Sequence, residues 1–153
     1  MLVYLIIIIT AYLLGNISTS YIVAKRLAGV DIRTQGSGNA GSTNVLRTLG
    51  KKAGALTFIG DVLKGLIAVL IFIAYGVNLD DTTCAYIAVV AVVLGHNYPV
   101  FLGFKGGKGV ATSLGSMLGM NPLVALLCLG FFIIIVAITK YVSLGSILGI
   151  GLS

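Results

Sequence analysis

The chain has 153 residues, of which 58% are apolar and only 9% are charged. Soluble domains average about 25% charged residues, so too few charges remain here to cover a water-facing surface; ample apolar side chains also exclude disorder. The formal charge is +6, but the cations lie in short stretches between apolar runs, which disfavours nucleic acid as a partner. The composition therefore predicts one membrane domain over residues 1–153.

Three long apolar runs are expected to cross the membrane as helices. Residues 2–24 would reach roughly 34 Å as a helix, against a hydrocarbon core of about 30 Å. A signal peptide is the rival interpretation, and it is rejected because no cationic stretch precedes Leu2. The second span is predicted over residues 54–77 and the third over residues 83–102, with the acidic turn 78–81 between them.

The rest of the chain is expected to contain shorter membrane elements. Keeping Lys108 and Lys140 on one face of the membrane requires an even number of crossings, with Asn121-Pro122 as the turn. Residues 110–120 give about 16 Å of helix, which is too short to span, so we predict a half-length helix beside a cavity. Residues 123–139 complete the return. The last apolar run, 144–152, is expected to be an incomplete sixth span of a C-terminally incomplete domain.

The cations predict the orientation of this bundle. Six of them lie between the first and second spans, which places that segment in the cytoplasm and the N-terminus outside. They are Lys25, Arg26, Arg33, Arg47, Lys51 and Lys52. The predicted fold class is therefore an all-α, polytopic integral membrane helix bundle with five spans, one of them half-length, plus the incomplete sixth.

The first dense polar stretch, residues 36–44 closed by Arg47, has the composition of an anion cradle. Glycines let backbone N–H groups turn inward, Ser and Thr hydroxyls add donors, and a guanidinium suits phosphate. The alternative is an ordinary flexible loop, since Gly, Ser and Asn are also common loop residues.

The second polar stretch, residues 95–112, places glycines around Lys105 and Lys108 on the same predicted face. The spacing is not that of a nucleotide-binding P-loop, because Gly109 follows Lys108 where Ser or Thr should stand. We interpret it as a cation-bearing turn before the half-length helix, whose N-terminus favours an anion. The alternative is that both lysines bind only lipid headgroups.

Three further ionisable residues stand within the apolar runs. Asp61 and Lys64 are three apart, so a neutralising pair is the preferred interpretation and a direct substrate role is the alternative. His96 is the only histidine, and it is either structural or a proton-transfer group. With one His, four Asp and no Glu, the chain is expected to hold no metal centre and no Mg²⁺-nucleotide site.

The two polar stretches together, SGNAGSTNVLR and GHNYPVFLGFKGGKGVAT, resemble the bacterial acyl-phosphate:glycerol-3-phosphate acyltransferase family, PlsY. The segment DVLKG between them and KYVSL after them extend the likeness over nearly the whole chain in the same order. The resemblance implies seven spans in a full family member, with a third signature of His and Asn residues beyond Ser153. It also implies a multi-pass protein of the bacterial inner membrane whose site faces the cytoplasm.

The implied reaction transfers a fatty acyl group from acyl phosphate to the sn-1 hydroxyl of glycerol 3-phosphate. The products would be lysophosphatidic acid and phosphate, the first step of phospholipid synthesis, with no cofactor; the oligomeric state is left open. The residues expected to be catalytic are Ser37, Arg47, Lys108 and His96. Those expected to bind substrate are Gly38, Asn39, Gly41, Thr43, Asn44, Lys105, Gly106, Gly107, Gly109 and Ser143.

The sequence leaves the proton acceptor and two rival functions open. The acceptor hydroxyl could lose its proton to His96, to the substrate's own phosphate or to a residue beyond Ser153. A small transporter of an anionic solute would also place glycines and cations beside a half-length helix. A noncatalytic binder of lipid headgroups is the third candidate. In it the first polar stretch would be an ordinary flexible loop, and the lysines of the second would bind only headgroups.

Overall fold

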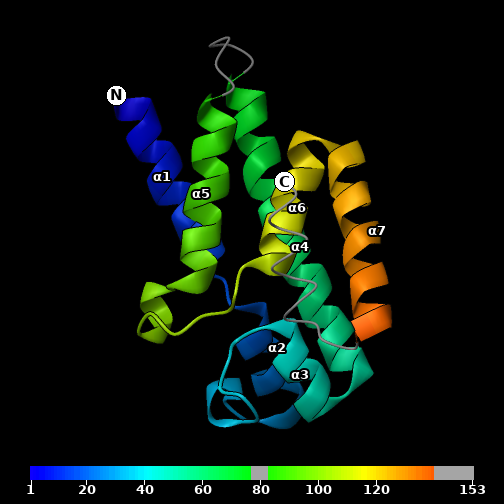
Figure 1. Cartoon of the computed structure of the whole chain (residues 1–153). Coiled ribbons are helices and arrows are strands. Elements are labelled where there is room, and N and C mark those ends of the chain that lie inside the picture. Colours follow the sequence, from blue (N-terminus) through cyan, green and yellow to red (C-terminus); the bar gives the residue numbers. More distant parts are fainter. Residues whose placement is uncertain (77–82, 140–153) are drawn as a thin grey trace.

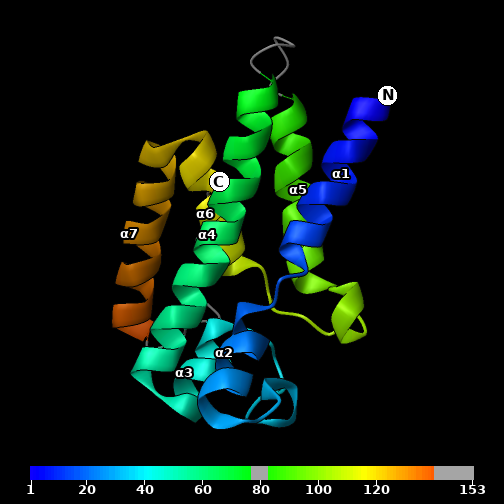
Figure 2. The same ribbon diagram turned by 180° about the vertical axis from the view of Figure 1, so that it is seen from behind.

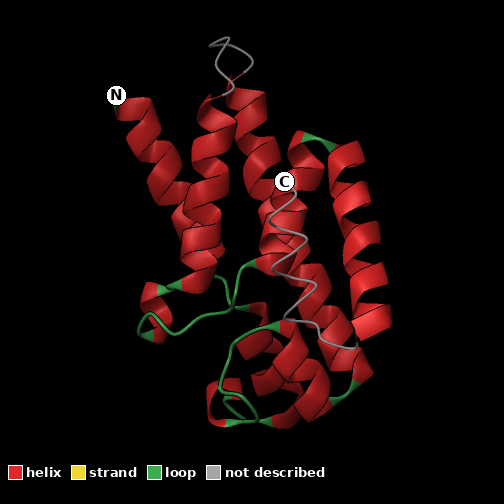
Figure 3. Cartoon of the chain, in the orientation of Figure 1, coloured by secondary structure: helices red, strands yellow, loops and turns green. Residues whose placement is uncertain are grey.

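The computed structural model describes residues 1–76 and 83–139, and this part of the chain contains helices and loops but no strand (Figure 3). An all-helical bundle was predicted and is confirmed. In chain order the elements are α1 (Leu2–Gly15), α2 (Thr19–Ala28), η1 (Ile32–Thr34), α3 (Ser42–Leu49), α4 (Lys51–Gly76), α5 (Thr83–Asn97), η2 (Val100–Leu102), α6 (Val110–Met120) and α7 (Pro122–Thr139).

Four segments of the described residues are long and apolar enough to cross a membrane. They are Leu2–Ala28, Lys51–Ala74, Thr83–Leu102 and Pro122–Thr139. The shorter apolar helix α6 has the length predicted for the half-length helix. The acidic turn 78–81 and the run 144–152 lie outside the described residues. The total number of spans and the side of the N-terminus therefore stay predictions.

Helices α1 and α5 pack side by side at a crossing made of glycines (Figures 1 and 2). A Cβ on Gly15 would collide with the carbonyl oxygen of Val92, and a Cβ on Gly95 would collide with that of Tyr12. Small residues at such crossings let membrane helices approach closely enough for backbone packing to hold them together. The core beside this crossing is built from Ile7, Ala11, Ala68, Phe72, Cys84, Ala88, Ala91 and Val92.

Helices α4 and α6 form a second close pair, again with glycines at the crossing. A Cβ on Gly65 would meet the carbonyl oxygen of Thr112, and a Cβ on Gly115 would meet that of Val62. Helix α7 packs on α6 and buries only Ala125, and many of its apolar side chains, such as Leu127 and Ile138, are exposed, as lipid-facing side chains are.

The first span is interrupted, so the prediction of one continuous helix over residues 2–24 is wrong. Asn16 turns back on α1, because its Nδ2 donates to the Tyr12 carbonyl at 2.6 Å while its Oδ1 accepts from the Val100 amide at 2.6 Å. Ser18 then caps α2 by accepting from the Tyr21 amide at 3.4 Å. Both are small polar residues whose side chains compete with helical hydrogen bonds, which is why the helix breaks here.

The break lets α2 lie across one end of the bundle instead of continuing α1 (Figures 1 and 2). Helices α2 and α3, both polar stretches and the ends of α4 and α5 all meet at that end (Figures 1 and 3). The two stretches were expected to share one face of the membrane, and the structure brings them together there.

The glycine crossing of α4 and α6 yields a matched test. Gly115→Ala forces a Cβ against the Val62 carbonyl and is expected to destabilise the protein by about 1–3 kcal/mol, the usual range for overpacking. Gly130→Ala on α7 adds the same atom where nothing lies within 4 Å, so its stability should stay within about 1 kcal/mol of the parent. Unfolding of both variants in detergent measures the difference, and equal stabilities would contradict the close crossing.

Candidate active site

The first polar stretch forms a loop wrapped around the buried side chain of Asn44. Its Nδ2 donates to the carbonyl oxygens of Gln35 and Asn39, both at 3.0 Å, and to that of Ile32 at 3.3 Å. Its Oδ1 accepts from the Ser37 amide at 3.0 Å. The sequence predicted that Asn44 binds substrate, but the structure commits its amide to holding the loop in shape.

Two glycines of this loop have backbones that other residues rarely adopt. Gly36 has φ of 54° and Gly38 has φ of 72°, which is the left-handed region. A Cβ on Gly36 would also collide with Oδ1 of Asn44. The loop can therefore close tightly around the amide of Asn44 only because glycine stands at these positions.

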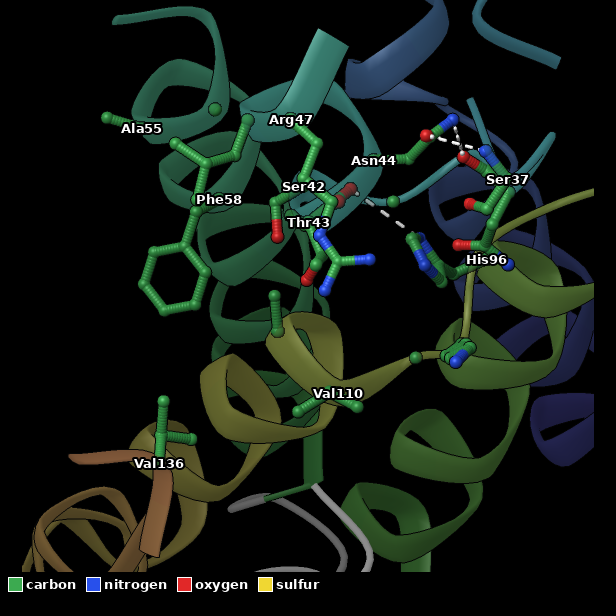
Figure 4. Close-up of a pocket in the computed structure, with 18 of the residues that line it drawn as sticks. Ser37, Ser42, Thr43, Asn44, Arg47, Ala55, Phe58, His96, Val110 and Val136 are labelled. Atoms are coloured by element: carbon green, nitrogen blue, oxygen red, sulfur yellow. Dashed lines mark hydrogen bonds and ion pairs between the residues drawn. The ribbon is translucent and has the colours of Figure 1, made fainter. Parts of the chain in front are cut away.

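Helix α3 begins directly after the loop and directs its N-terminus at a cavity. Gly41, Ser42 and Thr43, which make up its first turn and its N-cap, all line that cavity. Arg47 follows one turn later, and Figure 4 shows its guanidinium reaching into the space between Thr43 and His96. Free N–H groups, the helix dipole and a guanidinium together favour an anion at this position.

The second polar stretch returns from α5 and packs against the first. The Gly106 amide donates to the Asn97 carbonyl at 3.1 Å, and its own carbonyl accepts from the Ala40 amide at 3.3 Å. The Gly107 amide donates to the His96 carbonyl at 3.1 Å. Gly106 and Gly107 were predicted to bind substrate; the Gly106 carbonyl joins the two loops, and both amides donate within the second stretch.

A partly exposed ion pair outside the cavity braces the same region. Arg33 contacts Asp31 at 2.6 Å and donates to the Leu102 carbonyl at 2.8 Å, which ties the segment before the first loop to the second stretch. The hydrogen bond from Arg33 holds the pKa of Asp31 below its usual value. This link does not depend on the cavity residues, so it positions both loops before any ligand arrives.

The cavity between these elements has a volume of about 500 Å³ and two unlike ends (Figure 4). Ser37, Arg47 and His96 belong to its polar side, whereas Phe58 and Val136 face it from the apolar side. Its lining residues are Ser37, Asn39, Gly41, Ser42, Thr43, Asn44, Leu46, Arg47, Lys51, Gly54, Ala55, Phe58, Asp61, His96, Lys108, Gly109, Val110, Ala111, Phe132 and Val136. Such a cavity suits a ligand with an anionic head and an apolar tail.

A buried charged cluster forms the floor of the cavity. Lys64 lies 2.9 Å from Asp61, which confirms the predicted pair, and 2.8 Å from Nδ1 of His96. Lys64 also donates to the carbonyl oxygens of Ile17 at 2.8 Å and Gly15 at 3.2 Å, two carbonyls at the break between α1 and α2. The cluster therefore links α4, α5 and the interrupted first span beneath the anion-binding loops.

The structure brings most of the predicted site residues to this one cavity. Those that line it are Ser37, Asn39, Gly41, Thr43, Asn44, Arg47, His96, Lys108 and Gly109. Those described but not lining it are Gly38, Lys105, Gly106 and Gly107. Ser143 lies outside the described residues. Within residues 1–76 and 83–139, no three His, Cys, Asp or Glu side chains gather as a metal site would require.

The apolar residues that line the cavity were not predicted from the sequence. Phe58 lies on α4, and Phe132 and Val136 lie on α7. No residue pattern distinguishes these side chains from the lipid-facing ones beside them. Lys51 was also missed as a lining residue, although it follows Arg47 by four positions at the start of α4.

Comparison with known proteins assigns the family. A sequence model described as glycerol-3-phosphate acyltransferase matches residues 5–153. The glycerol-3-phosphate acyltransferase of Clostridioides difficile (strain 630) is 71% identical over 152 residues, which cover 98% of this chain and 74% of the relative. That of Geobacter sulfurreducens is 53% identical, covering 97% and 74%. This chain belongs to the glycerol-3-phosphate acyltransferase family.

Two solved structures of the family resemble this fold closely. The crystal structure of PlsY (YgiH), an integral membrane glycerol 3-phosphate acyltransferase, in its glycerol 3-phosphate form has a TM-score of 0.87 and 48% identity; the match covers 95% of this chain and 72% of that one. Its lysophosphatidic acid form has a TM-score of 0.85, with coverage of 95% and 71%. The chain is therefore an acyltransferase and a multi-pass membrane protein.

The role of Asn44 at the centre of the first loop can be tested by replacing its amide with a carboxylate. Asn44→Asp removes both N–H donors and puts a carboxylate against three carbonyl oxygens, so we expect a loss of about 1–3 kcal/mol and faster tryptic cleavage after Arg33. Asn121→Asp is the control, because its Oδ1 only accepts from the Val124 amide at the far end of α6 and an aspartate can do the same. Equal cleavage rates in the two variants would contradict the assignment.

Proposed function

We propose that this chain transfers a fatty acyl group from acyl phosphate to the sn-1 hydroxyl of glycerol 3-phosphate. The products are lysophosphatidic acid and inorganic phosphate, and the site opens to the cytoplasm at the bacterial inner membrane. The observation that carries the proposal is the cavity itself, which joins an anion-binding end to an apolar end at the edge of a membrane bundle. A soluble phosphate ester and a membrane lipid can meet only at such a boundary.

The donor phosphate fits the first loop and the start of α3. Ser37, Asn39, Gly41 and Thr43 line the cavity there, and the first turn of α3 presents backbone N–H groups. The loop is held in shape through Asn44 rather than by the ligand, so its donors are arranged before binding. Prearranged donors stabilise a departing phosphate without the free-energy cost of ordering them during the reaction.

The acceptor phosphate fits between Arg47 and Lys108. Arg47 approaches the cavity from α3, and Lys108 approaches it from the exposed turn before α6. Two cations from different parts of the cavity lining can hold two phosphate groups close together despite the mutual repulsion of the phosphates. This places the acceptor hydroxyl near the carbonyl carbon of the donor, which is the alignment that the reaction needs.

The acyl chain fits the apolar end of the cavity. This end is lined by Ala55 and Phe58 on α4, Phe132 and Val136 on α7 and Val110 of the half-length helix. Figure 4 shows Phe58 and Val136 on this side of the cavity. A half-length helix leaves space that a full span would fill, as the sequence predicted. The donor can then enter sideways from the bilayer with its phosphate leading toward the loops.

The chemistry requires alignment and charge stabilisation more than a reactive side chain. Acyl phosphate is a mixed anhydride, so the acceptor oxygen can attack its carbonyl carbon directly; the bond from that carbon to the phosphate oxygen then breaks and phosphate leaves. The hydroxyl proton must pass to a base. The cavity residues hold both anions and the developing negative charge, and no covalent acyl-enzyme is required.

Arg47 and Lys108 provide the direct test of this proposal. In the full-length protein, Arg47→Ala or Lys108→Ala should lower kcat/KM at least about tenfold, equivalent to roughly 1.4 kcal/mol of transition-state stabilisation. Arg26→Ala is the matched control, because Arg26 is an exposed cation of α2 that does not line the cavity. The measurement is phosphate release from acyl phosphate in the presence of glycerol 3-phosphate, in detergent.

The same assay separates the rival functions. An acyltransferase releases phosphate in detergent without a sealed vesicle, and release depends on glycerol 3-phosphate. A transporter or a headgroup binder releases none under these conditions. Unchanged kinetics in both cavity variants would contradict the roles assigned to the two cations.

A further inference from the structure

His96 is held at one ring nitrogen and open at the other. The residue is 6% exposed at the end of α5, and its Nδ1 lies 2.8 Å from Nζ of Lys64. None of the hydrogen bonds found among residues 1–76 and 83–139 involves Nε2, although His96 lines the cavity. Gly107 lies beside Nε2, and a Cβ there would collide with that atom. Glycine at 107 therefore leaves Nε2 uncovered.

The surroundings of Lys64 favour an ammonium over a neutral amine. Its Nζ lies within 3.2 Å of the carbonyl oxygens of Gly15 and Ile17 and 2.9 Å from the carboxylate of Asp61. Three oxygen acceptors, one of them a carboxylate oxygen, match the three donors of a charged lysine, which has no acceptor of its own. His96 Nδ1 is a fourth neighbour of Nζ, so two of the four contacts share one of the three ammonium protons.

An ammonium at 2.8 Å determines which nitrogen of His96 carries the proton. A protonated Nδ1 would point its N–H at a group that cannot accept it, whereas a bare Nδ1 presents a lone pair to a cation. Asp61 does not offer a good alternative acceptor, since its Oδ1 is 3.5 Å from Nδ1 and already accepts from Lys64 and Thr19. A doubly protonated ring would place two cations side by side against one carboxylate.

We propose that Lys64 holds His96 as the neutral tautomer protonated at Nε2, so that His96 donates a hydrogen bond to an anionic oxygen in the cavity and does not act as the proton acceptor. Lys64 is then a positioning residue, because it acts through His96 and not on the substrate. The identity of the oxygen rests on the proposed function; the tautomer does not. Of the three proton acceptors that the sequence left open, this removes His96.

The tautomer of His96 can be measured directly by NMR. The full-length protein is labelled with ¹⁵N-histidine, purified through a tag without histidine, and the signals of His96 are identified by their loss in His96→Gln. The proposal predicts a protonated Nε2 and an unprotonated Nδ1 near neutral pH without substrate. Arg26→Ala should leave both signals in place, and Lys64→Met should shift the Nδ1 signal. A protonated Nδ1 or an imidazolium in the unmutated protein would overturn the proposal.

Activity provides an independent readout. A glutamine amide can reach the place of Nε2 and donate, but it cannot accept a proton as a base. We expect His96→Gln to keep kcat within about tenfold of the parent, while His96→Ala loses about 10²-fold or more, the usual effect of removing a donor to developing charge. Equal large losses in both variants, with both still folded, would identify His96 as a base.

The proposed function and the tautomer of His96 can be refuted separately. Absence of phosphate release by the unmutated protein would refute the proposed function and leave the measured tautomer standing. A wrong tautomer in a protein that does release phosphate would refute only the inference about His96.

Discussion

The ion pair between Asp61 and Lys64 is the interaction on which this structure depends. Both side chains are almost fully buried inside a membrane bundle, at 1% and 5% exposure, where an unpaired charge would cost several kcal/mol. The ammonium also binds the two carbonyl oxygens freed where the first span breaks. Backbone carbonyls without partners are not tolerated at membrane depth, so the break persists because Lys64 supplies the missing donors.

That break positions the anion-binding loop. It turns α2 across the end of the bundle. There Ser20 donates to the Ala40 carbonyl of the loop at 2.8 Å, and Thr19 donates to Asp61 on α4. A Cβ on Gly60 would collide with Thr19, so α2 and α4 can approach only because glycine stands there. One buried pair thus connects the membrane core, the interrupted span and the loop that faces the cavity.

The sequence predicted those features that depend on length and spacing. The apolar runs, the half-length helix 110–120 and the Asp61–Lys64 pair follow from residues per turn and from membrane thickness. The family signatures likewise predicted most of the polar lining, including Ser37, Arg47 and Lys108. These features are local, or they are carried by a long sequence pattern.

What could not be predicted depends on contacts between distant segments. Asn16 and Ser18 break a helix inside an apolar run, but the Val100 amide that binds Asn16 and the lysine that binds carbonyls at the break come from distant segments. Asn44 was grouped with the substrate-binding residues from the family resemblance, and the partners of its side chain are backbone groups of the loop and of the segment before it. The apolar end of the cavity depends on where α7 returns, which no residue on α7 encodes by itself.

A double-mutant cycle on the buried pair tests this account most directly. Asp61→Asn and Lys64→Met are compared with the double variant by unfolding in detergent, with the free energy of unfolding as the readout. Each single change leaves a buried group without its partner, so the double variant should be more stable than the sum of the single effects by about 0.5–3 kcal/mol. Strictly additive effects would show that the pair does not hold the interrupted span and the cavity together.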